Sequence, residues 1–231
     1  MTTLLAIDTS TEACSVALLY QNQITHDFIL SQRDHTKQVL PMVDRLLKQA
    51  DCHLSQIDAI AFGKGPGSFT GVRIGIGVAQ GIALGIDRPM IGVSTLMTLA
   101  QGALRLYDAK KVISAIDARM DEVYLGAYEL TDDDQWQAGI NECVIKPAEV
   151  AEKLQTWRTQ ITDDIYATGT GWQVYPTMLQ DVILSTHHLP DSQDMIKIAE
   201  TMYAKGDFTK VEDVEPTYLR NEVTWRKLPG R

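Results

Sequence analysis

The sequence has few of the residues that hold small secreted or membrane proteins together. Its 231 residues include only three cysteines, Cys14, Cys52 and Cys143, with no Cys-x-x-Cys pair, which argues against a disulfide framework and a zinc ribbon. The longest apolar stretch, residues 74–86, has 13 residues and is shorter than the roughly 20 that span a bilayer. No basic segment precedes an apolar run at the start, so we expect no secretory signal, no membrane partner and a cytoplasmic location.

Basic charge is also scarce. The chain has 21 Lys and Arg against 30 Asp and Glu, a net charge of −9, which argues against unaided binding to a nucleic-acid backbone. Only the C-terminal residues 217–231 reverse the balance, with one acid, Glu222, against Arg220, Arg226, Lys227 and Arg231. This basic tail either contacts RNA or an acidic partner surface, or is a solvated chain end.

Metal ligands are few and poorly spaced. The five histidines include one close pair, His187 and His188, and adjacent residues cannot both face one metal from a helix, which needs a spacing such as i, i+4. We therefore expect no metal site.

Hydrophobic periodicity predicts an α/β protein with an internal duplication. The first half predicts three closely joined antiparallel strands at 4–7, 15–20 and 24–30, and then a helix at 36–50, a strand at 57–62, a helix at 69–84, a strand at 90–93 and a helix at 95–106. The second half predicts strands at 112–116, 123–128 and 136–140, a helix from 147 to 154, a strand at 165–168, a helix from about 172 and a last helix at 195–205, capped by Ser192 or Asp194. A βββαβα series thus starts near residue 3 and again near residue 111, which predicts two packed lobes, 1–106 and 107–231.

A glycine-rich segment, Gly-Lys-Gly-Pro-Gly-Ser-Phe-Thr-Gly-Val-Arg at residues 63–73, joins a predicted strand to a predicted helix. Glycine permits positive φ and close backbone approach, and a helix N-terminus attracts anions. The spacing matches neither G-x-x-x-x-G-K-[ST] nor G-x-G-x-x-G. The segment either turns the chain or binds a phosphate group.

The helix that follows carries a stripe of Gly77, Gly81 and Gly85 at intervals of four residues. Each interior glycine costs about 1 kcal/mol relative to alanine, so we expect another backbone to approach this stripe closely. That backbone belongs either to the protein's own sheet or preceding helix, or to a helix of another chain. The broad apolar face of the helix at 36–50 supports the second alternative.

Asp8 ends the first strand, at the position where phosphotransferases of the actin and sugar-kinase type hold Mg²⁺. Thr9 and Ser10 follow it in a hairpin without glycine, and Asp117 begins the equivalent hairpin of the second half. These are candidate phosphate loops, degenerate because they lack glycine; otherwise the acids and hydroxyls satisfy tight turns. A stand-alone nucleotide-binding, phosphotransferase-like ATPase therefore stays open as an alternative function.

Four segments in order resemble the bacterial TsaB family, also called YeaZ. They are residues 5–10 (LAIDTS), 65–73 (GPGSFTGVR), 115–119 (AIDAR) and 216–220 (PTYLR), so the resemblance runs from end to end. It implies the ASKHA fold, with two duplicated actin-like, RNase H-like lobes. It also implies a role in forming N6-threonylcarbamoyladenosine next to the anticodon of tRNAs that read ANN codons.

The resemblance further implies a non-catalytic scaffold. In the family, the catalytic paralogue TsaD carries the metal and the ATPase TsaE joins the pair, so we expect no cofactor in this chain, ATP and metal on the partner subunits, and contact with tRNA through the complex. The first two helices of the family form a four-helix bundle with TsaD, or with a second copy in its absence. The residues that would form that interface here are Val39, Val43, Leu46, Arg73, Ile76, Gly77 and Gln80.

Overall fold

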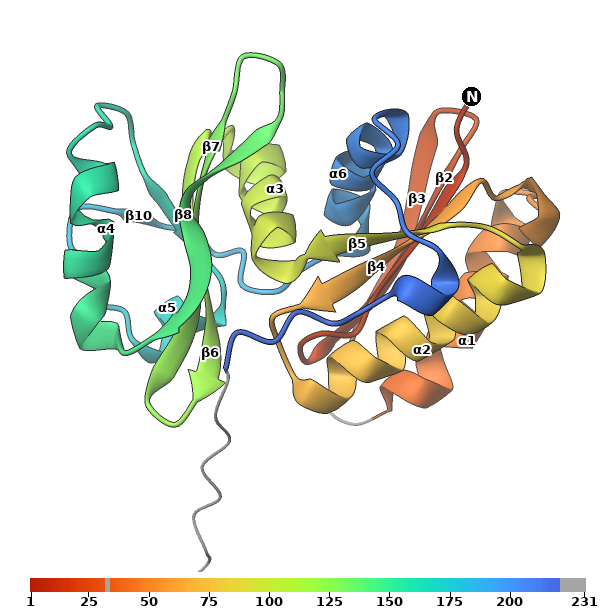
Figure 1. The fold of residues 1–231 in the computed structure, drawn as a ribbon, viewed down its shortest axis with the longest axis horizontal. Helices are drawn as coiled ribbons and strands as arrows, with labels where there is room; N and C mark the ends of the chain where they lie inside the picture. Colours follow the sequence, from red (N-terminus) through yellow and green to blue (C-terminus); the bar gives the residue numbers. More distant parts are fainter. Residues whose placement is uncertain (32–33, 221–231) are drawn as a thin grey trace, which may run out of the picture.

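Two five-stranded mixed sheets organise the protein (Figure 1), in a computed structural model that describes residues 1–31 and 34–220. The first sheet has the order β3-β2-β1-β4-β5, with β1 (Leu4–Asp8), β2 (Ala13–Tyr20), β3 (Gln23–Leu30), β4 (Ala59–Gly65) and β5 (Met90–Ser94). The second sheet has the order β10-β9-β6-β7-β8, with β6 (Lys111–Arg119), β7 (Glu122–Leu130), β8 (Trp136–Ile145), β9 (Tyr166–Thr168) and β10 (Ile183–Leu184).

The two sheets have the same topology, which confirms the predicted duplication. In each sheet the first three strands form antiparallel pairs with their neighbours. The fourth strand pairs parallel with the first strand, and the fifth strand pairs parallel with the fourth. β10 was not predicted. It contains only two residues, both exposed, and the apolar run around it, residues 182–184, is too short to predict a strand.

Among the described residues, five α-helices connect successive strands and a sixth follows the last strand. They are α1 (His35–Gln49), α2 (Phe69–Ile86), α3 (Thr95–Tyr107), α4 (Val150–Arg158), α5 (Thr170–Val174) and α6 (Ser192–Ala204). Pro147 starts a 3₁₀ turn, Pro147–Glu149, so α4 begins only at Val150 and extends past the predicted end. The N-cap of α6 is Asp191, whose side chain accepts from the backbone N–H of Gln193; the prediction of Ser192 or Asp194 as the cap was wrong.

Both faces of the first sheet are covered by helices (Figure 1). Leu4 and Leu5 in β1 are both fully buried and point to opposite faces, because side chains alternate along a strand. Leu5 belongs to the apolar cluster of α1 and α2, and Leu4 to the cluster that includes Met195 of α6. The continuous apolar run in β1 is therefore that of a strand buried on both faces.

The last helix of each half packs on the sheet of the other half. Leu96 and Leu99 of α3 form a cluster with Val112 of β6, while Met195 and Ile196 of α6 pack on the face of the first sheet opposite to α1 and α2. The boundary between the two lobes near residue 106 stays a prediction. The helix α6, from the second half of the chain, packs on the first sheet, which is formed by residues before 95. Each lobe thus depends on a helix from the other half.

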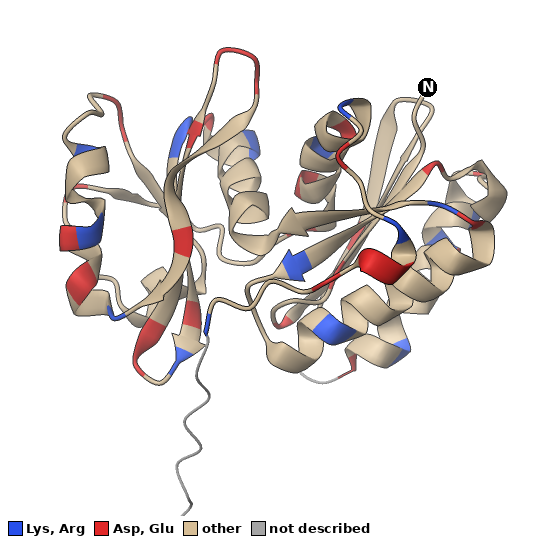
Figure 2. Cartoon of the chain, in the orientation of Figure 1, with Lys and Arg blue, Asp and Glu red and all other residues tan. Residues whose placement is uncertain are grey.

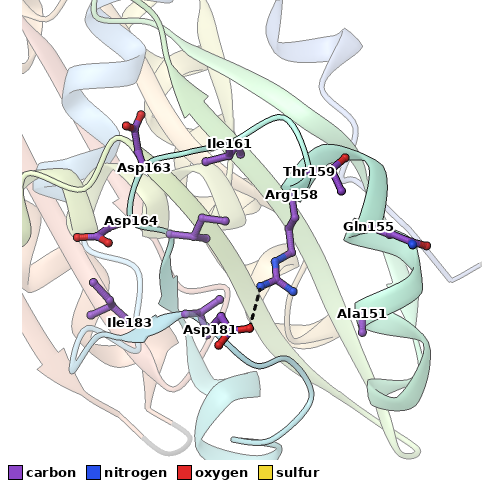
Figure 3. A pocket seen from close by; sticks show the side chains of 11 residues that line it. Ala151, Gln155, Arg158, Thr159, Ile161, Asp163, Asp164, Asp181 and Ile183 are labelled. Atoms are coloured by element: carbon purple, nitrogen blue, oxygen red, sulfur yellow. Dashed lines mark ion pairs between the residues drawn. The ribbon is translucent and has the colours of Figure 1, made fainter.

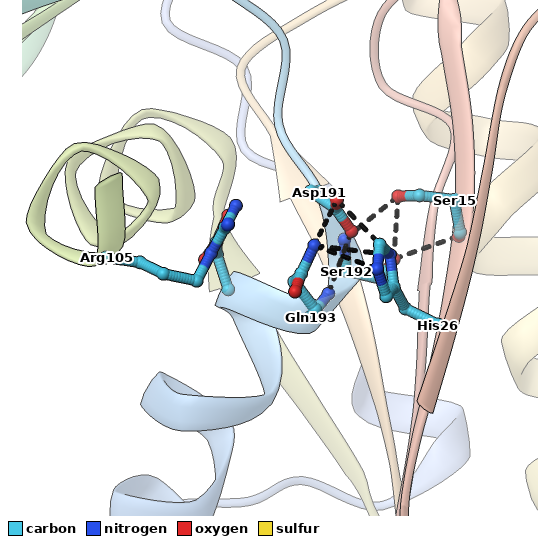
Figure 4. Close-up of polar contacts among 7 residues, drawn as sticks. Ser15, His26, Arg105, Asp191, Ser192 and Gln193 are labelled. Atoms are coloured by element: carbon cyan, nitrogen blue, oxygen red, sulfur yellow. Dashed lines mark hydrogen bonds and ion pairs between the residues drawn. The ribbon is translucent and has the colours of Figure 1, made fainter. Parts of the chain in front are cut away.

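Polar contacts fix this exchange (Figure 4). The backbone N–H of Ser192 donates to Ser15 Oγ in β2 at 3.0 Å, and Ser192 Oγ donates to the Ser15 carbonyl at 2.9 Å. Arg105 of α3 donates to both carboxylate oxygens of Asp194 at 2.6 and 3.0 Å, and the side chain of Asp194 is 1% exposed. These contacts anchor α6 to β2 and to α3.

The helix α2 is longer than the apolar run seen in the sequence. Phe69–Ile86 has 18 residues with a mean hydropathy of 1.4, so by length and composition alone it could cross a membrane, a test that core helices of soluble proteins also meet. Here α2 lies beside α1 below the first sheet (Figure 1) and packs on β4. Only a third of its residues are fully buried, and two large apolar side chains of the helix, Phe69 and Leu84, are exposed.

Candidate functional site

The glycine-rich segment packs against the turn between β1 and β2. A Cβ atom at Gly67 would lie 2.3 Å from the Ser10 carbonyl oxygen, and one at Gly71 would lie 2.2 Å from the Thr9 carbonyl oxygen. The backbone N–H of Ser68 donates to the Ser10 carbonyl at 2.7 Å. Glycine is required here because the backbone of the protein's own turn occupies the space of a side chain. The geometry therefore favours a packing role over a phosphate loop.

Asp8, Thr9 and Ser10 direct their polar groups inward. Asp8 Oδ1 accepts hydrogen bonds from Ser10 N at 2.7 Å and from Ser10 Oγ at 2.6 Å, and Thr9 Oγ1 donates to the Gly71 carbonyl at 2.7 Å. Asp8 Oδ2 is buried without a partner, next to Gly63. Burial raises the pKa of Asp8 from 3.8 to about 6. The structure therefore stabilises the protonated form of Asp8 relative to the carboxylate that a metal requires.

Asp117 occupies the equivalent place near the end of β6, and its side chain makes its contacts within its own turn. Its Oδ1 accepts from the backbone N–H of Arg119 at 3.0 Å, and its Oδ2 pairs with the Arg119 guanidinium at 3.0 Å. Arg119, Met120 and Asp121 all have positive φ, a conformation that costs energy in residues other than glycine. Asp117 and Asp8 share no hydrogen-bond partner. Within residues 1–31 and 34–220, no three His, Cys, Asp or Glu residues form a group that could hold a metal ion.

Four of the seven residues expected at a partner interface lie in the core. Val39, Val43, Leu46 and Ile76 are at most 6% exposed and belong to the cluster between the first sheet and its two helices. These four side chains therefore do not lie on the exposed surface of the two helices. Apolar periodicity could not show this, because it identifies the face of a helix that packs inward as readily as one that meets a partner.

The remaining three of these residues lie at or near the surface of α2. Arg73 and Gly77 are exposed, while Gln80 is half-buried and its Nε2 donates to the Val211 carbonyl at 3.1 Å. The Arg73 guanidinium lies 3.4 Å from the ring centroid of Phe69, a cation–π contact one helical turn away.

The glycine stripe of α2 faces open space. A Cβ at Gly77, Gly81 or Gly85 would meet no atom of residues 1–31 and 34–220 within 4 Å, so the alternative of packing on the protein's own sheet or preceding helix was wrong. Phe69 is 66% exposed and Leu84 is 73% exposed. Arg73 is the only charged residue of the helix, and most of α2 is uncharged in Figure 2. We call the exposed side chains of Phe69 and Leu84 together with the three glycines the α2 face.

Sequence reasoning missed Phe69 and Leu84. The signal was present: Phe69 starts a series of residues at intervals of four that includes the three glycines, and Leu84 lies seven residues after Gly77, so both are on the glycine side of the helix. Because Ile76 lies off this stripe, its apolar character indicated the opposite, buried side. On α1, Leu40 is the exposed apolar residue, at 52%.

The first residues of the basic tail join the two lobes beside the α2 face. The backbone N–H of Thr217 donates to the Lys64 carbonyl at 2.8 Å, and Tyr218 lies 6.3 Å from Phe69 between ring centroids. Arg220 then donates to the Ala118 carbonyl at 3.1 Å and pairs with Glu122 in the second lobe. The other basic residues of the predicted tail, Arg226, Lys227 and Arg231, lie outside the described residues.

The surface formed by the described residues includes two hollows of similar volume. A shallow one of about 670 Å³ lies at the edge of the second sheet (Figure 3), where Arg158 donates to the Gln180 carbonyl at 3.0 Å and lies 3.9 Å from the Asp181 carboxylate. Asp163 and Asp164 are its other acids. The second hollow, of about 720 Å³, lies between the lobes. The three cysteines are free, and burial raises the pKa of each thiol, which makes them poor nucleophiles.

Comparison with known proteins decides the family. The family model described as TsaD, tRNA N6-adenosine threonylcarbamoyltransferase, matches residues 24–223. The chain is 49% identical to the tRNA threonylcarbamoyladenosine biosynthesis protein TsaB of Escherichia coli over 99% of both chains, and 46% identical to that of Haemophilus influenzae over 99% and 98%. The chain belongs to the TsaB (YeaZ) family.

The structure of a family member agrees with this assignment. YeaZ from Pseudomonas aeruginosa is 44% identical and superposes with a TM-score of 0.87, covering 95% of this chain and all of the other. The two duplicated lobes are the ASKHA-type fold that the sequence predicted. A tRNA N6-adenosine threonylcarbamoyltransferase from Paracidovorax citrulli is 40% identical over 67 residues, which cover 29% of this chain. The TsaB-like chain thus shares sequence with the transferase as well.

Proposed function

We propose that this TsaB family member is a non-catalytic scaffold that activates the transferase TsaD in the formation of N6-threonylcarbamoyladenosine on tRNAs that read ANN codons. The α2 face carries the proposal, because it is an apolar, almost uncharged helix surface that the described part of the chain leaves uncovered. Exposed apolar patches of this kind are typical of sites of protein association.

The three glycines determine what kind of partner fits. Without side chains along one stripe, the axis of a second helix can approach α2 closely, while Phe69 and Leu84 supply apolar contacts at the two ends. We therefore propose a helix of TsaD as the partner of α2, with Leu40 of α1 at the margin. In the absence of TsaD the same face pairs two copies of this chain, so self-association and TsaD binding compete.

The candidate phosphate loops support a role without catalysis. Asp8, Thr9 and Ser10 make their hydrogen bonds within the protein, and the glycine-rich segment is packed against them. In this proposal ATP and the metal act on TsaD and TsaE, tRNA meets the assembled complex, and the complex is cytoplasmic. Hydrolysis of ATP by the isolated chain is the alternative function.

A drop-out reconstitution tests the role. TsaD, TsaE, a threonylcarbamoyl-adenylate synthase, ATP, threonine, bicarbonate and tRNA are combined with and without this chain, and modified adenosine is quantified. We expect product only with the chain present, and no ATP hydrolysis by the chain alone. Full product without it would refute the activator role, and ATP turnover by the isolated protein would support the alternative.

A matched pair of variants tests the surface. Leu84→Glu places a charge on the α2 face, and Leu106→Glu places the same charge in the last turn of α3, where Leu106 is 48% exposed. We expect Leu84→Glu to weaken TsaD binding about tenfold or more and Leu106→Glu to leave it unchanged. Equal affinities for the two variants would place the interface elsewhere.

A further inference from the structure

The larger hollow lies between the lobes, away from the α2 face. It has a volume of about 720 Å³ and is lined by the end of β5, the start of α3, the strand β8 and the helix α6. This size is typical of pockets that hold small molecules. A molecule bound there would contact both halves of the protein at once.

Glu142 of β8 is held rigidly at the wall of this hollow. Its Oε1 accepts two hydrogen bonds, from Tyr128 Oη at 2.6 Å and from Ser94 Oγ. Tyr128 is 1% exposed, and burial raises its pKa well above 10, so the phenol stays a donor. Glu142 Oε2 has no hydrogen-bond partner among the described residues and is not buried. The carboxylate is thus fixed in place by one oxygen and free to bind through the other.

The same strand, β8, also contributes an aromatic side chain to the lining of the hollow. Trp136 lines the hollow, and its Nε1 donates to Gln101 Oε1 at 2.8 Å. Its ring also meets Tyr128 edge to face at 6.4 Å, so two contacts fix its orientation. Met97 and Met202 add flexible apolar surface. An indole ring and a carboxylate that line the same hollow suit an organic cation, because the ring attracts both the charge and the apolar carbons.

The charges of the lining favour a cation over an anion. Lys197 pairs with Glu200 at 3.8 Å, and Lys205 donates to the side chain of Gln135. The charged residues of the lining that make no ion pair among the described residues are three acids and two bases, namely Asp134, Glu142, Asp207, Lys64 and Lys205. An anion would meet this excess of acids, whereas an ammonium group would neutralise part of it.

We propose that the hollow between the lobes is a binding site for a small organic cation that carries a primary ammonium group. The ammonium group donates to Glu142 Oε2, and the carbon chain of the ligand lies along Trp136 and the two methionines. Since Glu142 lies in the second lobe and Ser94 in the first, the occupied site ties the lobes together. This site is independent of the α2 face and of the proposed function.

Calorimetric titration of the full-length chain tests the proposal, with spermidine, putrescine and phenethylamine as probes. The titrations are made at about 150 mM salt, which screens the diffuse attraction of cations to a chain of charge −9. We expect saturable one-to-one binding of at least one probe, with a Kd below about 1 mM. Magnesium chloride of equal ionic strength should not displace it.

Glu142→Gln removes the charge and keeps a carbonyl oxygen for the two hydroxyl donors. We expect it to weaken binding about tenfold or more, while Glu152→Gln, the same change on the exposed face of α4, changes the affinity less than about twofold. Should Glu142→Gln fail to fold, Trp136→Ala against Trp136→Phe gives the same comparison, with loss expected only for alanine. The absence of saturable binding for all three probes, displacement by magnesium, or equal effects of the paired variants would overturn the proposal.

Discussion

The open glycine stripe leads to a prediction in which stability and binding change in opposite directions. Replacing Gly77, Gly81 and Gly85 by alanine introduces no clash, since a Cβ at each position meets no atom within 4 Å. Each replacement removes the backbone entropy cost of a glycine in a helix, about 1 kcal/mol. The triple variant should therefore gain about 2 to 3 kcal/mol in the free energy of unfolding, which for a chain of this length raises Tm by about 5 to 10 °C.

Binding to a helix on the α2 face should weaken in the same variant. Three added methyl groups separate the two helix axes, and such overpacking costs about 1 to 3 kcal/mol, or about a tenfold loss of affinity for TsaD. Stability is measured by thermal unfolding at concentrations where sedimentation shows a monomer, because self-association would itself raise Tm. Affinity is measured by calorimetry with TsaD.

Two other glycines of α2 provide the control. A Cβ at Gly71 would lie 2.2 Å from the Thr9 carbonyl oxygen, and one at Gly75 would lie 2.7 Å from Thr9 Oγ1. Alanine at either position should lower stability by about 1 to 3 kcal/mol. A triple variant that is less stable, or that binds TsaD as tightly as the natural chain, would refute the reasoning about the stripe.

Three further predictions concern the interior. The pKa of Asp8 is raised from 3.8 to about 6, so the folded state binds this proton more tightly than the unfolded state, and the resulting stability is lost as the pH rises through 6. The free energy of unfolding of Asp8→Asn, measured in urea titrations, should therefore rise by about 2 kcal/mol relative to that of the natural chain between pH 4 and pH 7.5. A difference that does not depend on pH would contradict the assignment. Val43→Glu should lower the free energy of unfolding by about 3 kcal/mol or more, since Val43 is 4% exposed; an unchanged urea midpoint would show that the side chain is not in the core. Arg105→Ala leaves the buried Asp194 without its partner and should lower the free energy of unfolding by about 2 kcal/mol, a value reduced because Arg105 is 39% exposed. A loss of stability below about 0.5 kcal/mol would indicate that water replaces the guanidinium.

The sequence predicted the elements whose signal is local. The strands at the start of each half are continuous apolar runs between turn residues, and the structure contains them as β1 and β6. The duplication followed from the order of such runs, which is the same near residue 3 and near residue 111. Three of the four segments shared with the TsaB family lie at the ends of these strands and in the loop before α2, and the glycines of that loop have specific steric roles.

The sequence could not distinguish the two faces of an apolar helix. Val39 and Leu46 have the spacing of a contact stripe, but that spacing is identical whether the stripe meets the protein's own sheet or another chain. For Gly81, two alternatives remained for the same reason. Only the position of the sheet above α1 and α2 decided which residues are covered and which remain exposed.

Long-range packing was decided by the tertiary structure alone. The sequence by itself determined that the chain is a duplicated α/β protein with a TsaB-like set of segments, because those features depend on residues close together in the chain. That α3 and α6 exchange sheets depends on contacts such as Ser15 with Ser192, 177 positions apart. The hollow between the lobes, with Glu142 held against Ser94, exists only because this exchange brings the two halves together.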